Sequence, residues 1–134
     1  YATEALLRGG DGDLARAKVE RLDEIVGDNR RYRLSLLRSQ AVLARWDGDP
    51  SRAITLLQTA ATLAQEMELP GEEWSILGAL GMLCADQDDP ARARQAWKAS
   101  ANIIHRLADS MDEEDLRAGF LAADPVPYIL ERGR

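Results

Sequence analysis

Asp47-Gly48-Asp49-Pro50-Ser51-Arg52-Ala53 is the stretch that decides the fold, because near copies of it lie on both sides along the chain. Residues 87–93 repeat the pattern forty positions later, and residues 11–17 repeat it thirty-six positions earlier. Each copy has an acidic or glycine-containing turn, a residue suited to begin a helix, and then Arg-Ala. A fixed spacing of this size is typical of a helical repeat array.

The composition also favours packed helices. The 134 residues are 46% hydrophobic but only 5% aromatic, whereas strands prefer β-branched and aromatic side chains. The net charge of −6 argues against a nucleic-acid-binding protein, whose phosphate contacts need a basic surface. The sequence contains no apolar run long enough to span a membrane and no signal peptide, so we expect a cytoplasmic location and no membrane partner.

Apolar residues recur at helical spacing in several runs, which glycine and proline separate. The chain begins at Tyr1 inside such a run, so we expect it to be part of a longer protein. Leu69-Pro70-Gly71 is interpreted as a sharp break. The predicted helices, by residue number, are 1–8, 13–26, 30–46, 50–67, 72–86 and 90–108.

Residues 110–134 are expected to close the array. Ser110 and Glu113 form a predicted capping box, in which each side chain bonds the other's backbone at the start of a helix. Leu116 and Phe120, four residues apart, give that short helix an apolar side. The Asp-Pro-Val-Pro sequence at residues 124–127 predicts an extended kink, after which the chain would dock back weakly.

Aligning the chain with itself at a spacing of forty residues pairs small residues with small ones and large with large. The small pairs are Ala41 with Gly81 and Ala53 with Ala93, and the large pairs are Leu37 with Leu77 and Leu57 with Trp97. Small residues let the two helices of a hairpin cross closely, while the large ones fill the space on either side. The pattern therefore predicts an all-α fold of antiparallel helix hairpins.

These residues resemble the tetratricopeptide repeat (TPR), a helix–turn–helix unit that stacks into a right-handed superhelix. The matching residues are Leu37, Gln40, Ala41, Ala44, Gly48, Ala53, Leu57 and Ala60 in one unit, and Leu77, Leu80, Gly81, Cys84, Ala93, Trp97 and Ser100 in the next. The units are forty residues long instead of about thirty-four, and Ala44 and Cys84 replace the family's aromatic residue. The resemblance implies TPR-like repeats over residues 1–109, with units at about 1–27 (truncated), 30–68 and 72–108, and a C-terminal capping helix and tail at 110–134.

Longer, degenerate units of this kind are similar to the helical arrays of large bacterial regulators, which are ATP-dependent transcription activators or nucleotide cyclases. That resemblance implies a regulatory module that binds a protein or peptide partner, or a neighbouring domain of the parent chain. Two alternatives stay open: homodimerisation through the end hairpins, and small-molecule sensing in the groove of the array. The sequence has no nucleophile motif, phosphate-binding loop or metal-ligand cluster, so we expect neither an enzyme nor a cofactor or metal.

A stripe of arginines is the main candidate for a binding surface. Arg31, Arg38 and Arg45 are seven residues apart, and each step of seven drifts only about 20° around a helix. In TPR proteins the first helix of each hairpin lines a concave groove, where such a stripe would receive the carboxylates of a partner. The rest of the predicted groove consists of Val42, Trp46, Ser75, Gly78 and Met82. The alternative is a solvated face whose arginines pair with neighbouring acids.

The remaining conspicuous residues have structural interpretations. We expect Trp97 in the core and Trp74 between hairpins, whereas Trp46 either packs or serves as an exposed anchor. His105 is expected on a helix surface, and Cys84, the only cysteine, stands where a small buried residue is needed. The acidic clusters at residues 86–89 and 112–115 are predicted to stabilise helix starts.

Overall fold

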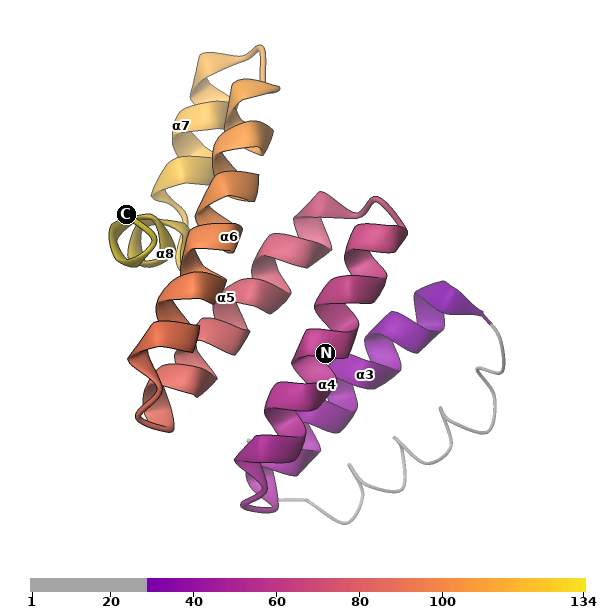
Figure 1. The fold of residues 1–134 in the computed structure, drawn as a ribbon. Helices are drawn as coiled ribbons and strands as arrows, with labels where there is room; N and C mark the ends of the chain where they lie inside the picture. Colours follow the sequence, from indigo (N-terminus) through magenta and orange to yellow (C-terminus); the bar gives the residue numbers. More distant parts are fainter. Residues whose placement is uncertain (1–28) are drawn as a thin grey trace. The chain divides into compact units, whose positions relative to one another are not determined.

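The computed structural model describes residues 29–134, which form six α-helices and no strand (Figure 1). They are α3 (Arg30–Trp46), α4 (Pro50–Glu66), α5 (Pro70–Asp86), α6 (Pro90–Asp109), α7 (Glu114–Ala122) and α8 (Val126–Arg132). The predicted all-α class is confirmed for this part of the chain. The predicted helices at residues 1–8 and 13–26, and with them the truncated first unit, lie outside the described residues.

The chain divides into two compact units, Tyr1–Leu63 and Ala64–Arg134. Of the described helices, α3 and most of α4 belong to the first unit, and the last turn of α4 with α5 to α8 belongs to the second. Both units bury mainly leucine, isoleucine and alanine side chains, as the periodicity of the sequence predicts.

The three turns between α3 and α6 share one hydrogen-bonded geometry. In each turn a backbone N–H donates to the carbonyl five residues earlier: Asp49 to Ala44 (2.8 Å), Leu69 to Ala64 (2.9 Å) and Asp89 to Cys84 (3.0 Å). The residue before that N–H has a positive φ, which is 78° at Gly48, 55° at Glu68 and 57° at Asp88. This is the Schellman motif, which satisfies carbonyls that a helix end leaves open.

Proline follows each of these turns at the start of the next helix, as Pro50, Pro70 and Pro90. The missing N–H of proline is harmless there, because it would have no partner within the helix. The predicted break between α4 and α5 is present at Leu69, but α5 begins at Pro70, two residues before the predicted start. The turns recur every twenty residues, half the spacing found in the sequence, and each of α3, α4 and α5 has 17 residues.

In the second unit, α5 packs along α6, and the two helices cross closely at Gly81. A Cβ added to Gly81 would overlap the indole ring of Trp97, whose side chain is only 8% exposed. Ser100, buried on α6, donates its hydroxyl hydrogen to the Trp74 carbonyl oxygen of α5 (2.7 Å). The core position of Trp97 and the close crossing at Gly81 are thus confirmed.

The segment after α6 differs from the predicted capping box. Ser110 donates its hydroxyl hydrogen to the Leu107 carbonyl (2.7 Å), and α7 begins after Glu113, whose side chain caps nothing. The capping-box prediction is wrong because the chain makes a non-helical step of three residues, 111–113, before α7 begins. Arg117 of α7 instead closes the end of α6, since its guanidinium donates to the carbonyls of Ala108 (3.0 Å) and Met111 (2.7 Å).

The last segment is helical, so the predicted extended kink at residues 124–127 is wrong. Pro127 occupies the second position of α8, where proline needs no helical partner for its nitrogen. Val126 and Ile129 are buried, with 1% and 2% exposure, and Ile129 lies over Gly78 of α5. α8, and not α7, is therefore the element that buries apolar side chains against the α5–α6 pair.

Candidate interaction surface on α3

α3 is capped at its start and buried along most of its length. The Asn29 side-chain oxygen accepts hydrogen bonds from the N–H groups of Arg31 (3.1 Å) and Tyr32 (3.4 Å), which fixes the first turn. Its buried residues are Leu34, Leu36, Leu37, Ser39, Ala41, Leu43 and Ala44. Among its accessible residues, Arg31, Ser35, Arg38, Val42 and Arg45 form a strip at spacings of four and three, which Trp46 continues.

The structure places five of the eight residues of the predicted groove on this strip. Arg31 and Arg45 are exposed, while Arg38 and Val42 are half-buried. Arg38 and Arg45 also interact with other groups of the chain. The other three, Ser75, Gly78 and Met82, lie on α5 in the second unit. Ser75 is half-buried and Met82 is 40% exposed, but Gly78 is buried, so its predicted place in a groove is wrong.

α3 carries positive charge in a chain that is acidic as a whole. α3 contains Arg30, Arg31, Arg33, Arg38 and Arg45 and no acidic residue. Residues 29–63 hold six arginines against two aspartates, a net charge of +4, whereas residues 64–134 hold seven basic and fourteen acidic residues, a net charge of −7. A partner that approaches α3 therefore meets a potential opposite in sign to the net charge of the chain.

Two large aromatic side chains are exposed on the same helix. Tyr32 is 58% exposed and Trp46 is 55% exposed. They are fourteen residues apart, close to four full turns, so they lie on the same side of α3 next to the arginine strip. Exposed aromatic and arginine side chains are the residues most often found in interface hot spots. The exposure of Trp46 agrees with its interpretation as an anchor.

We call Arg31, Tyr32, Arg38, Val42, Arg45 and Trp46 together the α3 face. Tyr32 was not singled out in the sequence, although its spacing from Trp46 was a usable signal.

No family model, curated protein or solved structure matches the chain. A functional interpretation therefore depends on the chain's own residues and on the arrangement of its helices.

The other candidate residues have local structural roles. His105 is exposed on α6, and residues 29–134 contain no group of three or more side chains that could hold a metal ion. Cys84 is buried, and burial raises the pKa of its thiol above the ordinary value. Trp74 packs edge-on against Phe120 of α7, with ring centroids 5.9 Å apart. None of the described helices is long and apolar enough to cross a membrane.

The acidic clusters act mainly at helix starts, as predicted. The Asp89 carboxylate accepts a hydrogen bond from the Arg92 N–H (3.1 Å), and Asp49 accepts one from the Arg52 N–H (3.2 Å). Glu114 and Asp115 occupy the first turn of α7, where the helix dipole favours negative charge. Asp86 and Asp88 are exceptions, because Asp86 is the last residue of α5 and Asp88 lies at positive φ in the turn that follows it.

Proposed function

We propose that this chain is a protein–protein interaction module that binds an acidic segment of a partner protein through the α3 face. Its helix hairpins would continue as a TPR-like right-handed superhelix, and the module would belong to a larger bacterial signalling or transcription-regulatory protein. This wider setting rests on the resemblance described above. Binding without chemistry is the proposed mode of action.

The observation that carries the proposal is the combination of charge and exposure on α3. Five arginines with no acid on one helix attract carboxylates, and arginine binds them in a bidentate manner. Tyr32 and Trp46 add large apolar surfaces at the two ends of the strip. Electrostatic attraction steers the partner to α3 and sets where along the helix it binds. The aromatic side chains, once the partner covers them, supply most of the affinity.

The experiment is photo-crosslinking from the α3 face. A photoreactive amino acid at position 46, in the full parent protein, is expected to capture a partner, which mass spectrometry identifies. The same amino acid at Gln65, exposed on α4, is the matched control. The partner is expected to be crosslinked in an acidic stretch.

The affinity of the identified partner is then measured with charge-reversed variants. Arg31→Glu with Arg45→Glu changes two exposed side chains and is expected to weaken binding at least tenfold, by about 1.4 kcal/mol. Arg52→Glu with Arg106→Glu changes the net charge equally at exposed positions of α4 and α6 and should have little effect. Equal effects of the two double variants would refute the α3 face as the binding surface.

A further inference from the structure

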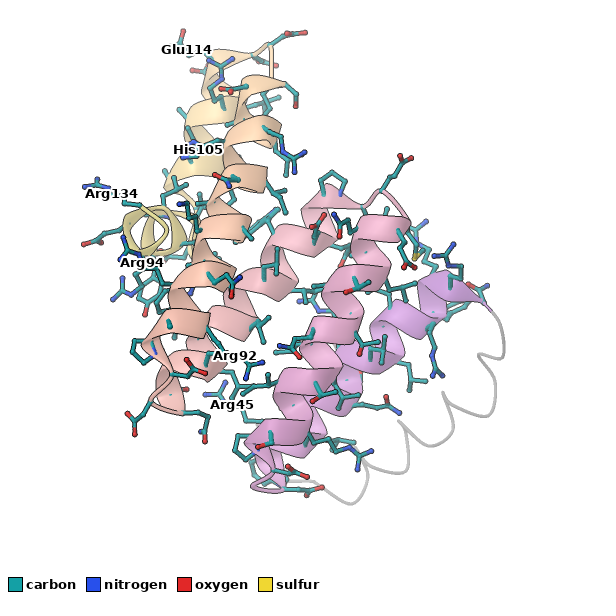
Figure 2. All side chains as sticks on the ribbon, viewed as in Figure 1. Arg45, Arg92, Arg94, His105, Glu114 and Arg134 are labelled. Carbon is teal, nitrogen blue, oxygen red and sulfur yellow. The ribbon has the colours of Figure 1, made fainter. Side chains whose placement is uncertain are left out.

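Residues 112–122, which we call the α7 segment, expose acidic and apolar side chains. Asp112, Glu113, Glu114 and Asp115 are all exposed, and none of them has an ion pair within residues 29–134. Glu114 points away from the helices of its own unit at the start of α7 (Figure 2). α7 has no buried residue, and its Leu116 is 61% exposed.

The α7 segment is nevertheless anchored, so this surface is presented in a defined orientation. Arg117 bonds two carbonyls at the end of α6, and Phe120 packs against Trp74. These contacts use one side of α7 and leave the acidic start and Leu116 available.

The α3 face and the α7 segment are complementary. α3 has five arginines and no acid, and residues 112–115 are four consecutive acids. Each helix also leaves apolar side chains exposed beside its charges: Tyr32 and Trp46 on α3, and Leu116 on α7.

The spacing of these residues is complementary too. On α3, Val42 and Trp46 are one turn apart with Arg45 between them, a rise of about 6 Å at roughly 1.5 Å per residue. On α7, Asp115 and Leu116 are adjacent, as Arg45 and Trp46 are on α3. A helix laid along α3 can therefore set Leu116 against Trp46 while a carboxylate meets Arg45.

We propose that the α3 face of one copy of this chain binds the α7 segment of a second copy, so that the protein associates with itself. This inference rests on the proposed function in taking the α3 face as a protein-binding surface, and it names the partner. A contact between two different surfaces is heterologous, and it closes into a ring or dimer or propagates as a chain according to the rotation between copies.

A polyanion such as nucleic acid is the alternative ligand for an arginine-rich helix surface. The net charge of −6 opposes it, and a phosphate backbone has no apolar group to match Trp46. The two occupants differ in one respect that can be measured: only the second copy requires the acids of the α7 segment.

The experiment is analytical ultracentrifugation of the 134-residue chain from about 1 μM to about 1 mM, the range that spans weak protein association. We expect the average mass to rise with concentration at low salt. Between about 0.1 M and about 1 M salt the Debye length falls from about 10 Å to about 3 Å, so the association should weaken markedly.

Charge reversal and its rescue identify the two surfaces. Arg31→Glu with Arg45→Glu, and separately Asp112→Lys with Glu113→Lys, should each abolish self-association, with helix content unchanged by circular dichroism. The chain that carries all four substitutions should associate again, because its charges are exchanged between the surfaces. If the glutamate variant of α3 does not fold, Arg31→Gln with Arg45→Gln tests the same surface without reversal.

A chain that stays monomeric at every concentration would overturn this inference, as would self-association that the α7 substitutions leave unchanged. Fluorescence anisotropy with a labelled single-stranded DNA tests nucleic acid as the alternative ligand of α3. DNA binding that is lost in the α3 variant and kept in the α7 variant would overturn the inference and favour nucleic acid. The proposed function fails separately, if the photo-crosslinked partner binds equally well after the α3 arginines are reversed.

Discussion

Replacement of Gly81 by alanine tests the contact that closes α5 against α6. The added Cβ would overlap Nε1 and Cδ1 of Trp97 and lie 2.8 Å from its Cε2. The ring has little room to move, because Trp97 is 8% exposed and packs edge-on against Tyr128, with ring centroids 5.9 Å apart. Arg132 lies over both rings, its Cζ 3.3 Å from the centroid of Tyr128 and 5.8 Å from that of Trp97.

Two opposing effects decide the magnitude for Gly81→Ala. Overpacking a buried site costs about 1–3 kcal/mol, and an overlap of this extent belongs in the upper half of that range. Alanine also stabilises a helix interior by about 0.5–1 kcal/mol relative to glycine. The expected net result is a loss of about 1–2 kcal/mol in the free energy of unfolding.

Gly119→Ala in α7 is the matched control, because nothing lies within 4 Å of its added Cβ. Its free energy of unfolding should rise by about 0.5–1 kcal/mol, because only the preference of a helix for alanine over glycine acts there. Urea unfolding followed by circular dichroism measures both variants. With a slope of about 1–3 kcal/mol/M, the two midpoints should move in opposite directions, by about 0.5–1 M for Gly81→Ala.

The reasoning for Gly81 fails if both substitutions stabilise the chain. A Trp97→Leu background provides a second check, since a smaller side chain removes the overlap. In that background Gly81→Ala should lose its penalty, and the difference between the two backgrounds measures the coupling between positions 81 and 97.

Three further predictions concern the turns and the buried thiol. Asp89→Ala removes the cap on the Arg92 N–H and should lower the free energy of unfolding by about 1 kcal/mol, measured by urea unfolding. Glu68→Gly relieves a side chain at φ 55° and should raise the melting temperature, in line with a gain of about 0.5–1 kcal/mol. Burial raises the pKa of the Cys84 thiol in the folded chain, so the unfolded chain loses that proton first as pH rises. The contribution of the Cys84 thiol to the free energy of unfolding is therefore complete below about pH 8.5, the ordinary pKa of a thiol, and declines above that pH. Cys84→Ala should remove this decline, which is measured as the change of the urea midpoint with pH.

Local signals predicted the helices where capping and periodicity agree. α3 has the predicted bounds, Arg30–Trp46, because Asn29 caps it and its apolar residues follow one helical period. The start of α5 was misplaced because Pro70 and Gly71 are breakers in most contexts, and only the preceding Schellman turn makes them the first residues of a helix.

α8 is an element that local sequence patterns do not predict, because it depends on contacts with distant residues. Its seven residues are too few to form a stable helix alone, so it depends on the contacts that bury Val126 and Ile129. Those contacts join residues far apart in the sequence, such as Ile129 and Gly78, and no local pattern reports them. The predicted groove has the same difficulty, because Arg38 and Met82 lie on helices of different units.

The twenty-residue period allows the helices to be compared with one another, and this comparison isolates the α3 face. Two positions are small or apolar and buried in α3, α4, α5 and α6 alike: Ala41, Ala61, Gly81 and Ala101 at one, and Ala44, Ala64, Cys84 and Ile104 at the other. Those positions serve the packing that every helix needs. The positions of the arginine strip share no such requirement, since Arg31, Arg38 and Arg45 correspond to Gly71, Gly78 and Ala85 in α5. The Trp46 position is likewise occupied by Glu66, Asp86 and Arg106 in the other helices. The other described helices form without arginine or tryptophan at these places, so helix packing alone does not account for them on α3. Interactions within the chain involve Arg38 and Arg45, and the proposed binding surface would account for the exposed Arg31 and Trp46.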